Sequence, residues 1–140
     1  MERTLAILKP DSVAAGNAGN ILAHLEKEGF RILALKKMRL AEAQAREFYA
    51  VHKERPFYGD LVEFMTSGPV IPVALERDGA VAGLRQVMGA TDSEKAEAGT
   101  VRNRYGTNIE RNAIHGSDSP ENAAREVGFF FSEAELIAGR

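Results

Sequence analysis

One histidine of this 140-residue chain, His115, lies in a segment of small and polar residues, 112–119, that could carry out chemistry. Gly116 follows it and leaves the imidazole open to a substrate, while the polar residues 117–119 can fix its orientation. The unperturbed pKa of imidazole leaves this group largely neutral, and so nucleophilic, near pH 7. The segment indicates a nucleophilic histidine, although on its own it is equally consistent with a polar turn before a helix.

No glycine-rich loop is available to bind phosphate through backbone amides. The glycines of residues 16–19 match neither the P-loop pattern nor G-x-G-x-x-G. If the protein handles phosphate, charged side chains must hold it, and the candidates are Lys9 at a strand end, Arg85 on a helix and Arg102 in a loop. Considered singly, each of these residues is more typical of an ordinary surface charge.

The composition excludes several classes of function. The formal net charge is −2, so no basic field indicates binding to nucleic acid. Without cysteine there are no disulfides or thiolate metal sites, and His24, His52 and His115 lack the spacing of metal ligands. The apolar runs are too short to cross a membrane. The charged start of the chain does not resemble a signal peptide, so we expect a cytoplasmic protein.

Four short apolar runs predict β-strands. They span residues 4–8, 30–35, 70–75 and 129–131. Pro72 is awkward in the third run, because a central strand needs the N–H group that proline lacks. Three consecutive phenylalanines make up the fourth run, a composition typical of a strand.

Helical spacing of apolar residues separates these runs. It covers residues around 21–25, 42–51, 61–65, 81–88 and 123–127. Ser119 followed by Pro120 is a strong helix start, and Ser132 begins a capping-box pattern. The polar residues 89–106 predict a long loop with at most a short helix, of a kind that is usually functional. The order predicts one α+β domain, residues 1–140, with a ferredoxin-like β-α-β-β-α-β antiparallel sheet and helices over one face.

Seven short motifs occur together in this chain. In order they are Leu8-Lys9-Pro10-Asp11, Tyr49-Ala50-Val51-His52, Arg55-Pro56-Phe57, Ser67-Gly68-Pro69-Val70, Met88-Gly89-Ala90-Thr91, Gly99-Thr100-Val101-Arg102 and residues 112–119. Their order and spacing resemble those of nucleoside diphosphate kinases, over nearly the whole chain from Arg3 to about Phe131. The His-Gly-Ser-Asp-Ser run with an upstream asparagine is highly specific for that family.

The resemblance implies covalent catalysis by His115. The matching histidine of the family takes the γ-phosphoryl group from a nucleoside triphosphate such as ATP and passes it to a nucleoside diphosphate in a second step at one site. Glu126 matches the carboxylate that hydrogen-bonds the imidazole and sets its tautomer, with Ser117 nearby. A carboxylate, a hydroxyl and a histidine at this spacing suit such a relay.

The resemblance also implies how phosphate is held. Arg85, Thr91 and Arg102 match the clamp on the phosphate oxygens. Guanidinium groups can bind such oxygens through two hydrogen bonds and spread charge as the phosphoryl group moves. Lys9 and Tyr49 match residues closer to the ribose and to the reacting phosphoryl group.

The nucleoside would be bound mainly by apolar contact. Asn112 is expected to bond the ribose hydroxyls alongside Lys9, and Phe57 matches the platform on which the base stacks, with Ile109 as the opposite wall. Stacking recognises a π-face, so base selectivity should be weak. Mg²⁺ should arrive on the nucleotide, because no acidic cluster in the sequence offers a metal site of the protein's own.

This sequence departs from the family pattern mainly in the long loop. Ser93 and Ala98 stand where many members have proline, and Arg104 stands where an acidic residue is usual. Tyr105 takes the place of phenylalanine, and Pro72 that of a β-branched or aliphatic residue. None of these is a catalytic group, so the departures bear on loop rigidity and subunit contacts. Members form homo-oligomers, and we expect a tetramer or hexamer built on dimers.

Two functions of other classes compete with this interpretation. A histidine phosphotransfer module would be phosphorylated on His115 by a partner protein, but it would need no nucleoside pocket of Phe57, Asn112 and Lys9 and is usually a helical bundle. In a non-catalytic ferredoxin-like binding module, the pairing of His115 with Glu126 would be accidental. Labelled ATP with Mg²⁺, followed by a search for label on the protein and on added GDP, separates the three.

Overall fold

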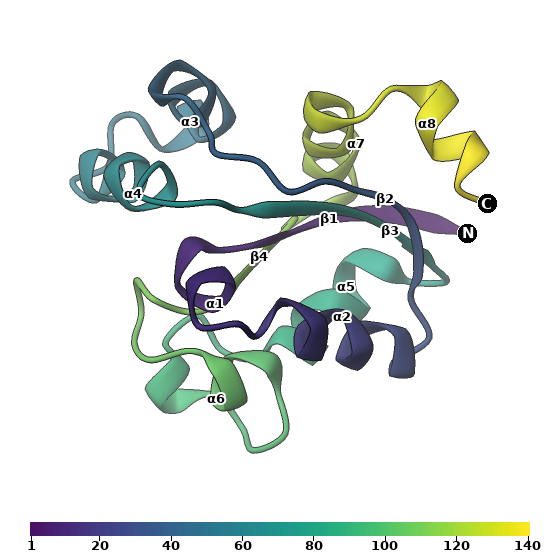
Figure 1. Ribbon diagram of the computed structural model, residues 1–140, viewed down its shortest axis with the longest axis horizontal. Coiled ribbons are helices and arrows are strands. Elements are labelled where there is room, and N and C mark those ends of the chain that lie inside the picture. Colours follow the sequence, from purple (N-terminus) through teal and green to yellow (C-terminus); the bar gives the residue numbers. More distant parts are fainter.

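A computed structural model describes all 140 residues and contains a four-stranded antiparallel sheet with helices above and below it (Figure 1). The strands, in the spatial order β2-β3-β1-β4, are β1 (Glu2–Leu8), β2 (Arg31–Leu35), β3 (Ile71–Arg77) and β4 (Ile114–Gly116). The α-helices are α1 (Pro10–Ala14), α2 (Ala18–Lys27), α3 (Glu42–Phe48), α4 (Tyr58–Met65), α5 (Ala80–Met88), α6 (Val101–Tyr105), α7 (Pro120–Phe130) and α8 (Glu133–Ala138). Two short 3-10 helices complete the fold, η1 (Ala50–His52) and η2 (Ser93–Lys95). The ferredoxin-like α+β prediction is confirmed.

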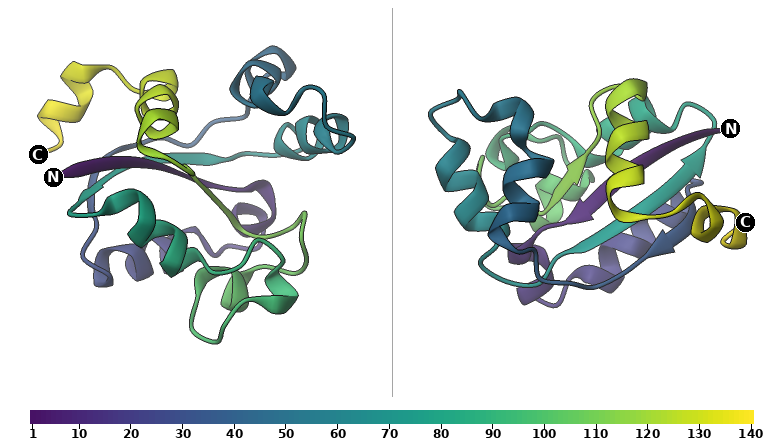
Figure 2. Two further views of the ribbon diagram at one scale, coloured as in Figure 1. Left: turned by 180° about the vertical axis from the view of Figure 1, so that it is seen from behind. Right: turned by 90° about the horizontal axis from the view of Figure 1, so that it is seen from above.

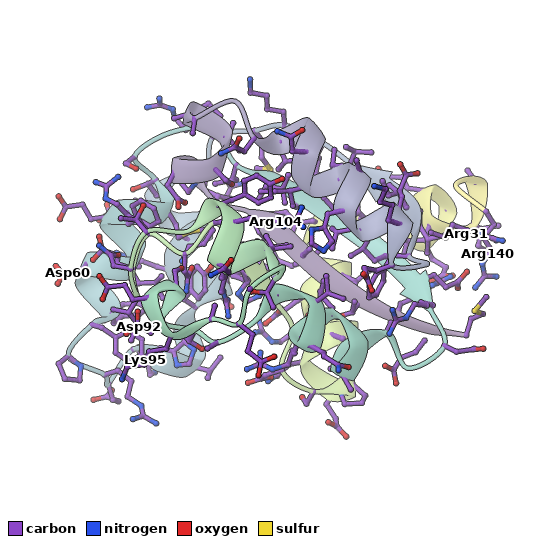
Figure 3. The ribbon with its side chains drawn as sticks, turned by 90° about the horizontal axis from the view of Figure 1, so that it is seen from below. Arg31, Asp60, Asp92, Lys95, Arg104 and Arg140 are labelled. Carbon is purple, nitrogen blue, oxygen red and sulfur yellow. The ribbon has the colours of Figure 1, made fainter.

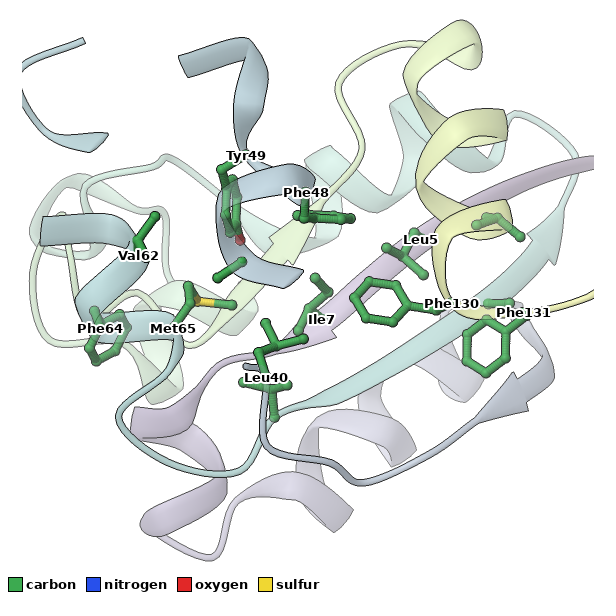
Figure 4. Packing of buried hydrophobic residues seen from close by; sticks show 14 of the residues in the cluster. Leu5, Ile7, Leu40, Phe48, Tyr49, Val62, Phe64, Met65, Phe130 and Phe131 are labelled. Carbon is green, nitrogen blue, oxygen red and sulfur yellow. The ribbon is translucent and has the colours of Figure 1, made fainter. Parts of the chain in front are cut away.

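Alternate side chains of β1 enter two separate hydrophobic cores. Leu5 and Ile7 pack into a core with residues of α3, α4, α7 and α8 (Figure 4). Ala6 and Leu8 point to the opposite face and pack with residues of α2, α5 and α6. The prediction of helices over one face is therefore wrong, because β1 is apolar at successive positions and needs cover on both sides (Figure 2).

The position of the fourth strand corrects the sequence prediction. Phe129 and Phe130 close helix α7, and Phe131 is its C-cap, so residues 129–131 are not a strand. Local aromatic composition resembles a strand, but the three rings pack in or against one hydrophobic core, and the helix continues through Phe130. The fourth strand is instead β4, whose three residues are too few for a pattern to be recognised; it pairs with β1 and carries His115.

Other helix boundaries are confirmed by their capping groups, with some additions. Ser119 caps α7 through a hydrogen bond from the N–H of Asn122, and Pro120 is the first helical residue. Ser132 forms the predicted capping box of α8. Helix α1 was not predicted, and residues 89–106 contain two short helical segments, η2 and α6, where at most one was expected. None of the helices has the length and apolar character needed to cross a membrane.

Pro72 lies in β3, between β1 and β2, without breaking the sheet. Its carbonyl accepts a hydrogen bond from the N–H of Lys36, so the side of Pro72 that lacks a donor faces β2. The regular pairing of β2 with β3 ends one position earlier, at Leu35 opposite Val73. Proline is therefore tolerated here because it lies just beyond the last regular pair.

Candidate functional site

His115 occupies the middle of the short edge strand β4. Ile114 and Gly116 are buried against α5, where a Cβ at Gly116 would lie 2.5 Å from Sδ of Met88. Strand alternation turns His115 to the opposite face, where its ring makes edge contacts with Phe48 and Tyr49 at 5.4 and 5.8 Å between ring centroids. The imidazole remains 19% exposed, so it can be reached from solvent.

One carboxylate oxygen joins the histidine to a buried serine. Oε1 of Glu126, on α7, lies 2.8 Å from Nε2 of His115 and accepts a hydrogen bond of 2.8 Å from Oγ of Ser117. Oε2 lies 3.6 Å from the guanidinium of Arg125. Burial opposes ionisation of Glu126, but the hydrogen bond and charge of His115, with the help of Ser117 and Arg125, hold its pKa below the usual range. The carboxylate is therefore ionised near neutral pH.

A cavity of about 410 Å³ opens in front of His115. It brings together eight residues singled out in the sequence, namely Lys9, Tyr49, Phe57, Thr91, Arg102, Ile109, Asn112 and His115. An adjoining hollow of about 330 Å³ shares Tyr49, His52, Thr91, Arg102 and His115 with it, and adds Arg85 and Glu126. Ser117 lines neither hollow and is fully buried behind Glu126. All eleven predicted residues therefore belong to one region. Figure 3 shows that Asp60, which lies on the cavity wall, and Arg140 are at opposite ends of the molecule.

Asn112 connects three parts of the cavity wall. Its Oδ1 accepts a 2.8 Å hydrogen bond from Nζ of Lys9, and its Nδ2 donates to the carbonyls of Thr91 and Ile109. Both amide hydrogens are thus in use, and the side chain is 3% exposed. Asn112 holds the wall together, and only a free lone pair of Oδ1 remains for a ligand.

Two buried cations lie in this wall. Lys9 donates to the carbonyl of Glu110 as well as to Asn112, and burial lowers its pKa to about 8. Arg102 donates to the carbonyls of Gly89 and Ile114, and its Nε is buried without a partner. Burial, with the positive charge of Arg85, lowers the pKa of Arg102 to about 10. These desolvated charges would interact strongly with an anion in the cavity.

The other predicted residues form the open end and the floor of the cavity. Phe57 is 48% exposed and Ile109 is 65% exposed, so two apolar side chains flank the entrance. The Tyr49 ring is buried, and burial, together with the negative charge of Glu126, raises the pKa of its hydroxyl. Tyr49 therefore keeps its proton and can act as a hydrogen-bond donor.

Several wall residues were not predicted from the sequence. His52 is the last residue of η1, and its ring lines both hollows and lies 5.5 Å from that of Phe57. Asp60 and Glu110 line the larger cavity, and Arg125 lines the hollow next to His115. His52 belongs to one of the seven sequence motifs, and that motif could have identified it as a wall residue. No feature of the sequence identified Asp60, Glu110 or Arg125.

The structure contains no group of three or more His, Asp or Glu side chains placed to hold a metal ion. A metal would therefore need most of its ligands from a bound molecule or from water. Cations around His115 instead suit a multiply charged anion, and the two apolar side chains at the entrance suit a flat ring.

Proteins of one family resemble this chain over nearly its whole length. The family model described as nucleoside diphosphate kinase matches residues 2–136. The nucleoside diphosphate kinase of Persephonella marina is 51% identical over 137 residues, with 98% of both chains covered. That of Sulfurimonas denitrificans is 57% identical over 136 residues, covering 97% of this chain and 99% of the relative.

Solved structures show the same likeness. A crystal structure of the Aquifex aeolicus nucleoside diphosphate kinase superposes with a TM-score of 0.94 at 49% identity, covering 96% of this chain and 97% of that one. The halophilic nucleoside diphosphate kinase from Halobacterium salinarum, in complex with CDP, has a TM-score of 0.91 at 43% identity, with 96% and 90% covered.

Proposed function

The chain belongs to the nucleoside diphosphate kinase family of phosphotransferases, and from this premise we propose that it transfers the γ-phosphoryl group in two steps through a phosphohistidine on His115. The single observation that carries the proposal is the contact of Glu126 with Nε2 of His115 beside a cavity lined by cations. Because Nε2 is engaged, Nδ1 is the ring nitrogen left to attack phosphorus.

In the first step, the lone pair of Nδ1 forms a bond to the γ-phosphorus of a nucleoside triphosphate. The bond from that phosphorus to the β–γ bridging oxygen breaks, and the nucleoside diphosphate leaves with the electron pair. In the second step, a terminal oxygen on the β-phosphate of another diphosphate attacks the same phosphorus, and the P–N bond breaks. The neutral imidazole is then regenerated, so the cycle needs no other reactant.

Glu126 and the cations would have separate tasks in this cycle. The ionised Glu126 holds the ring orientation and stabilises the positive charge that develops on the imidazole as Nδ1 forms its bond. Arg85, Arg102 and Thr91 would bind phosphate oxygens, and the protonated Tyr49 would donate a hydrogen bond to them. Their shared location around His115 supports these roles.

The nucleoside would occupy the cavity between Phe57 and Ile109. Stacking on Phe57 does not select one base, so we propose acceptance of both purine and pyrimidine nucleotides. The ribose would lie near Lys9 and the free lone pair of Asn112. Binding of CDP by the Halobacterium salinarum relative makes a pyrimidine nucleotide a reasonable ligand for this chain as well.

Mg²⁺ would be bound through the nucleotide phosphates, since the chain offers no group of acidic side chains for it. When bound, it would neutralise phosphate charge and orient the reacting group. Arg85 and Arg102 would provide the protein's own positive charge next to the same phosphates.

Assembly and location are proposed from the family resemblance alone. We propose a homo-oligomer, a tetramer or hexamer built on dimers, which sedimentation at micromolar protein concentration would detect. An active monomer under those conditions would contradict this part of the proposal. The expectation of a cytoplasmic protein also stays a prediction.

Transfer of label from ATP to GDP tests the proposed activity. With Mg²⁺ and ATP labelled on the γ-phosphate, the protein should form labelled GTP, and His115→Ala should abolish turnover. His24→Gln is a matched control, because His24 lies on α2 away from the cavity. A phosphotransfer module would take label only from a phosphorylated partner protein, and a binding module would form no labelled GTP.

A further inference from the structure

Ala113 is the only residue other than glycine with a positive φ, at 73°. It lies between Asn112 and the first residue of β4. The left-handed conformation brings the Cβ of an L-residue close to the backbone, so alanine adopts it only where its surroundings enforce it. Something must therefore hold this turn.

The beginning of α1 binds both polar groups of Ala113. Oδ2 of Asp11 accepts a 3.1 Å hydrogen bond from the N–H of Ala113. The carbonyl of Ala113 accepts one from Oγ of Ser12 at 2.8 Å and another from the N–H of Lys9 at 2.9 Å. Three hydrogen bonds, from Lys9, Asp11 and Ser12, thus fix a single residue about 100 positions later in the chain.

The turn at Ala113 sets the direction in which Asn112 leaves the sheet. Asn112 is the residue that bonds Lys9, the Thr91 carbonyl and the Ile109 carbonyl at once. A change of φ at position 113 would rotate the preceding peptide and move that side chain away from at least one of these partners. The nucleoside end of the cavity therefore depends on the turn.

His115 is held by other contacts. It pairs with Ile7 of β1, its ring is bound by Glu126, and the carbonyl of its neighbour Ile114 accepts a hydrogen bond from Arg102. These contacts do not involve residues 11–12. Relaxation of the turn should therefore disturb nucleoside binding more than it disturbs the reacting nitrogen.

We propose that Asp11 is a positioning residue for the nucleoside, acting through the strained turn at Ala113 on Asn112. The proposal rests on the proposed function, because it takes Asn112 and Lys9 to face the ribose. Oδ1 of Asp11 is buried without a hydrogen-bond partner, so only one carboxylate oxygen is used, and an asparagine could supply that acceptor equally well.

Four variants test the role of Asp11. Asp11→Ala removes the acceptor, whereas Asp11→Asn keeps an acceptor oxygen and loses only the charge. Adding Ala113→Gly to Asp11→Ala lets position 113 keep a positive φ at little cost without the side-chain contact. Ser12→Ala is the milder alternative should Asp11→Ala not fold, since the N–H of Lys9 still binds the Ala113 carbonyl.

The dissociation constant for ADP, measured by calorimetry, and the steady-state KM for the diphosphate should each rise about tenfold in Asp11→Ala, the effect of one lost hydrogen bond of about 1.4 kcal/mol. The value of kcat at saturating nucleotide should fall by a smaller factor. Asp11→Asn should resemble the wild type well below pH 8, where Lys9 stays charged without the help of the Asp11 carboxylate. Ala113→Gly should recover most of the lost affinity in the Asp11→Ala background. Ser12→Ala should show the same direction of change with a smaller size.

Unchanged ADP affinity in Asp11→Ala would overturn the proposal, and so would a loss of kcat larger than the rise in KM. An equal loss of ADP affinity in Asp11→Asn and Asp11→Ala would show that the charge of Asp11, and not its hydrogen bond to Ala113, supports nucleotide binding. Each of these results leaves wild-type turnover intact and refutes only the role of Asp11. A wild-type protein without transfer from ATP to GDP would instead overturn the proposed function, and this role with it.

Discussion

Nε2 of His115 and Oε1 of Glu126 lie 2.8 Å apart, although one residue is on a strand and the other on a helix. The same oxygen accepts a hydrogen bond from the hydroxyl of Ser117, so the carboxylate is itself held in place. This pairing decides which ring nitrogen carries the proton and which is free. It makes Nδ1 the atom on which the proposed mechanism depends.

Glu126→Ala should slow phosphorylation of His115 without abolishing it, because the nucleophile remains while its orientation is lost. One charge-assisted hydrogen bond contributes about 1.5–3 kcal/mol, so the single-turnover rate should fall by roughly 10- to 160-fold. Rapid-quench measurement of the labelled protein gives this rate. Glu126→Gln keeps the shape of the side chain and loses its charge, so its phosphorylation rate should lie between those of Glu126→Ala and the wild type. Wild-type rates across pH in both variants would mean that the pairing has no role in catalysis.

Nucleotide affinity should decline on the alkaline side because of Lys9. Burial lowers the pKa of Lys9 to about 8, so the ammonium group is present below that pH and is lost above it in the free protein. The dissociation constant for ADP should therefore increase through this range, and Lys9→Gln should bind more weakly with a flatter pH profile. Glu126, whose pKa is below its usual range, should add no change there. If ADP affinity declined with rising pH in Lys9→Gln as it does in the wild type, the decline would belong to a group other than Lys9.

Phe57→Ala should weaken nucleotide binding by about 1–3 kcal/mol, the usual contribution of a base stacked on an aromatic ring. Almost half of this ring is exposed at the cavity entrance, so its loss should leave the fold intact. Steady-state KM values for ADP, GDP, CDP and UDP provide the comparison. Phe57→Tyr keeps the ring and should retain affinity for all four. Strict preference of the wild type for one base, or an unaltered KM in Phe57→Ala, would contradict stacking at this position.

Proline at positions 93 and 98 should stabilise the long loop and, if the loop lies at a subunit contact, the homo-oligomer proposed above. Ser93 is the first residue of η2, its N–H makes only a long 3.5 Å hydrogen bond, and its Oγ is buried without a partner. Asp92 before it is extended, as the residue preceding a proline should be. The double variant Ser93→Pro, Ala98→Pro should gain roughly 0.4–1 kcal/mol per compatible site and show a higher denaturant midpoint for subunit dissociation. Ser93→Ala, which removes the hydroxyl alone, separates the two effects. The same dissociation midpoint in the double variant and the wild type would show that the loop does not stabilise the assembly.

The chemistry of the site was easier to predict from the sequence than the elements that carry it. Residue types in segment 112–119 indicate His115, and the family resemblance implies Glu126 and Ser117 beside it. The structure places His115 and Ser117 within hydrogen-bonding distance of Glu126. The strand that carries His115 has only three residues, and three residues are too few for a periodic pattern. The phenylalanines at residues 129–131 have strand-like composition, yet packing against Leu5 and Phe48 keeps the first two in a helix.

Hydrogen bonds between side chains and backbone groups far away in the sequence could not be predicted at all. Asp11 belongs to the first of the seven motifs, but the motif does not reveal its partner, which is an N–H group of the main chain. In the same way, the sequence did not predict that both amide hydrogens of Asn112, which is proposed to face a ribose, are bound to the carbonyls of Thr91 and Ile109. Such roles depend on backbone geometry, which residue types do not encode locally.

The most direct measurement of the central claim is the chemical nature and position of the label on the protein after a single exposure to ATP labelled on its γ-phosphate. We expect close to one phosphoryl group per chain, bound to Nδ1 of His115, stable in alkali, lost in acid and transferred completely to added GDP. His115→Ala should take up no label while still binding ADP. Label that survives acid, or label on the His115→Ala variant, would contradict a phosphohistidine intermediate on this residue.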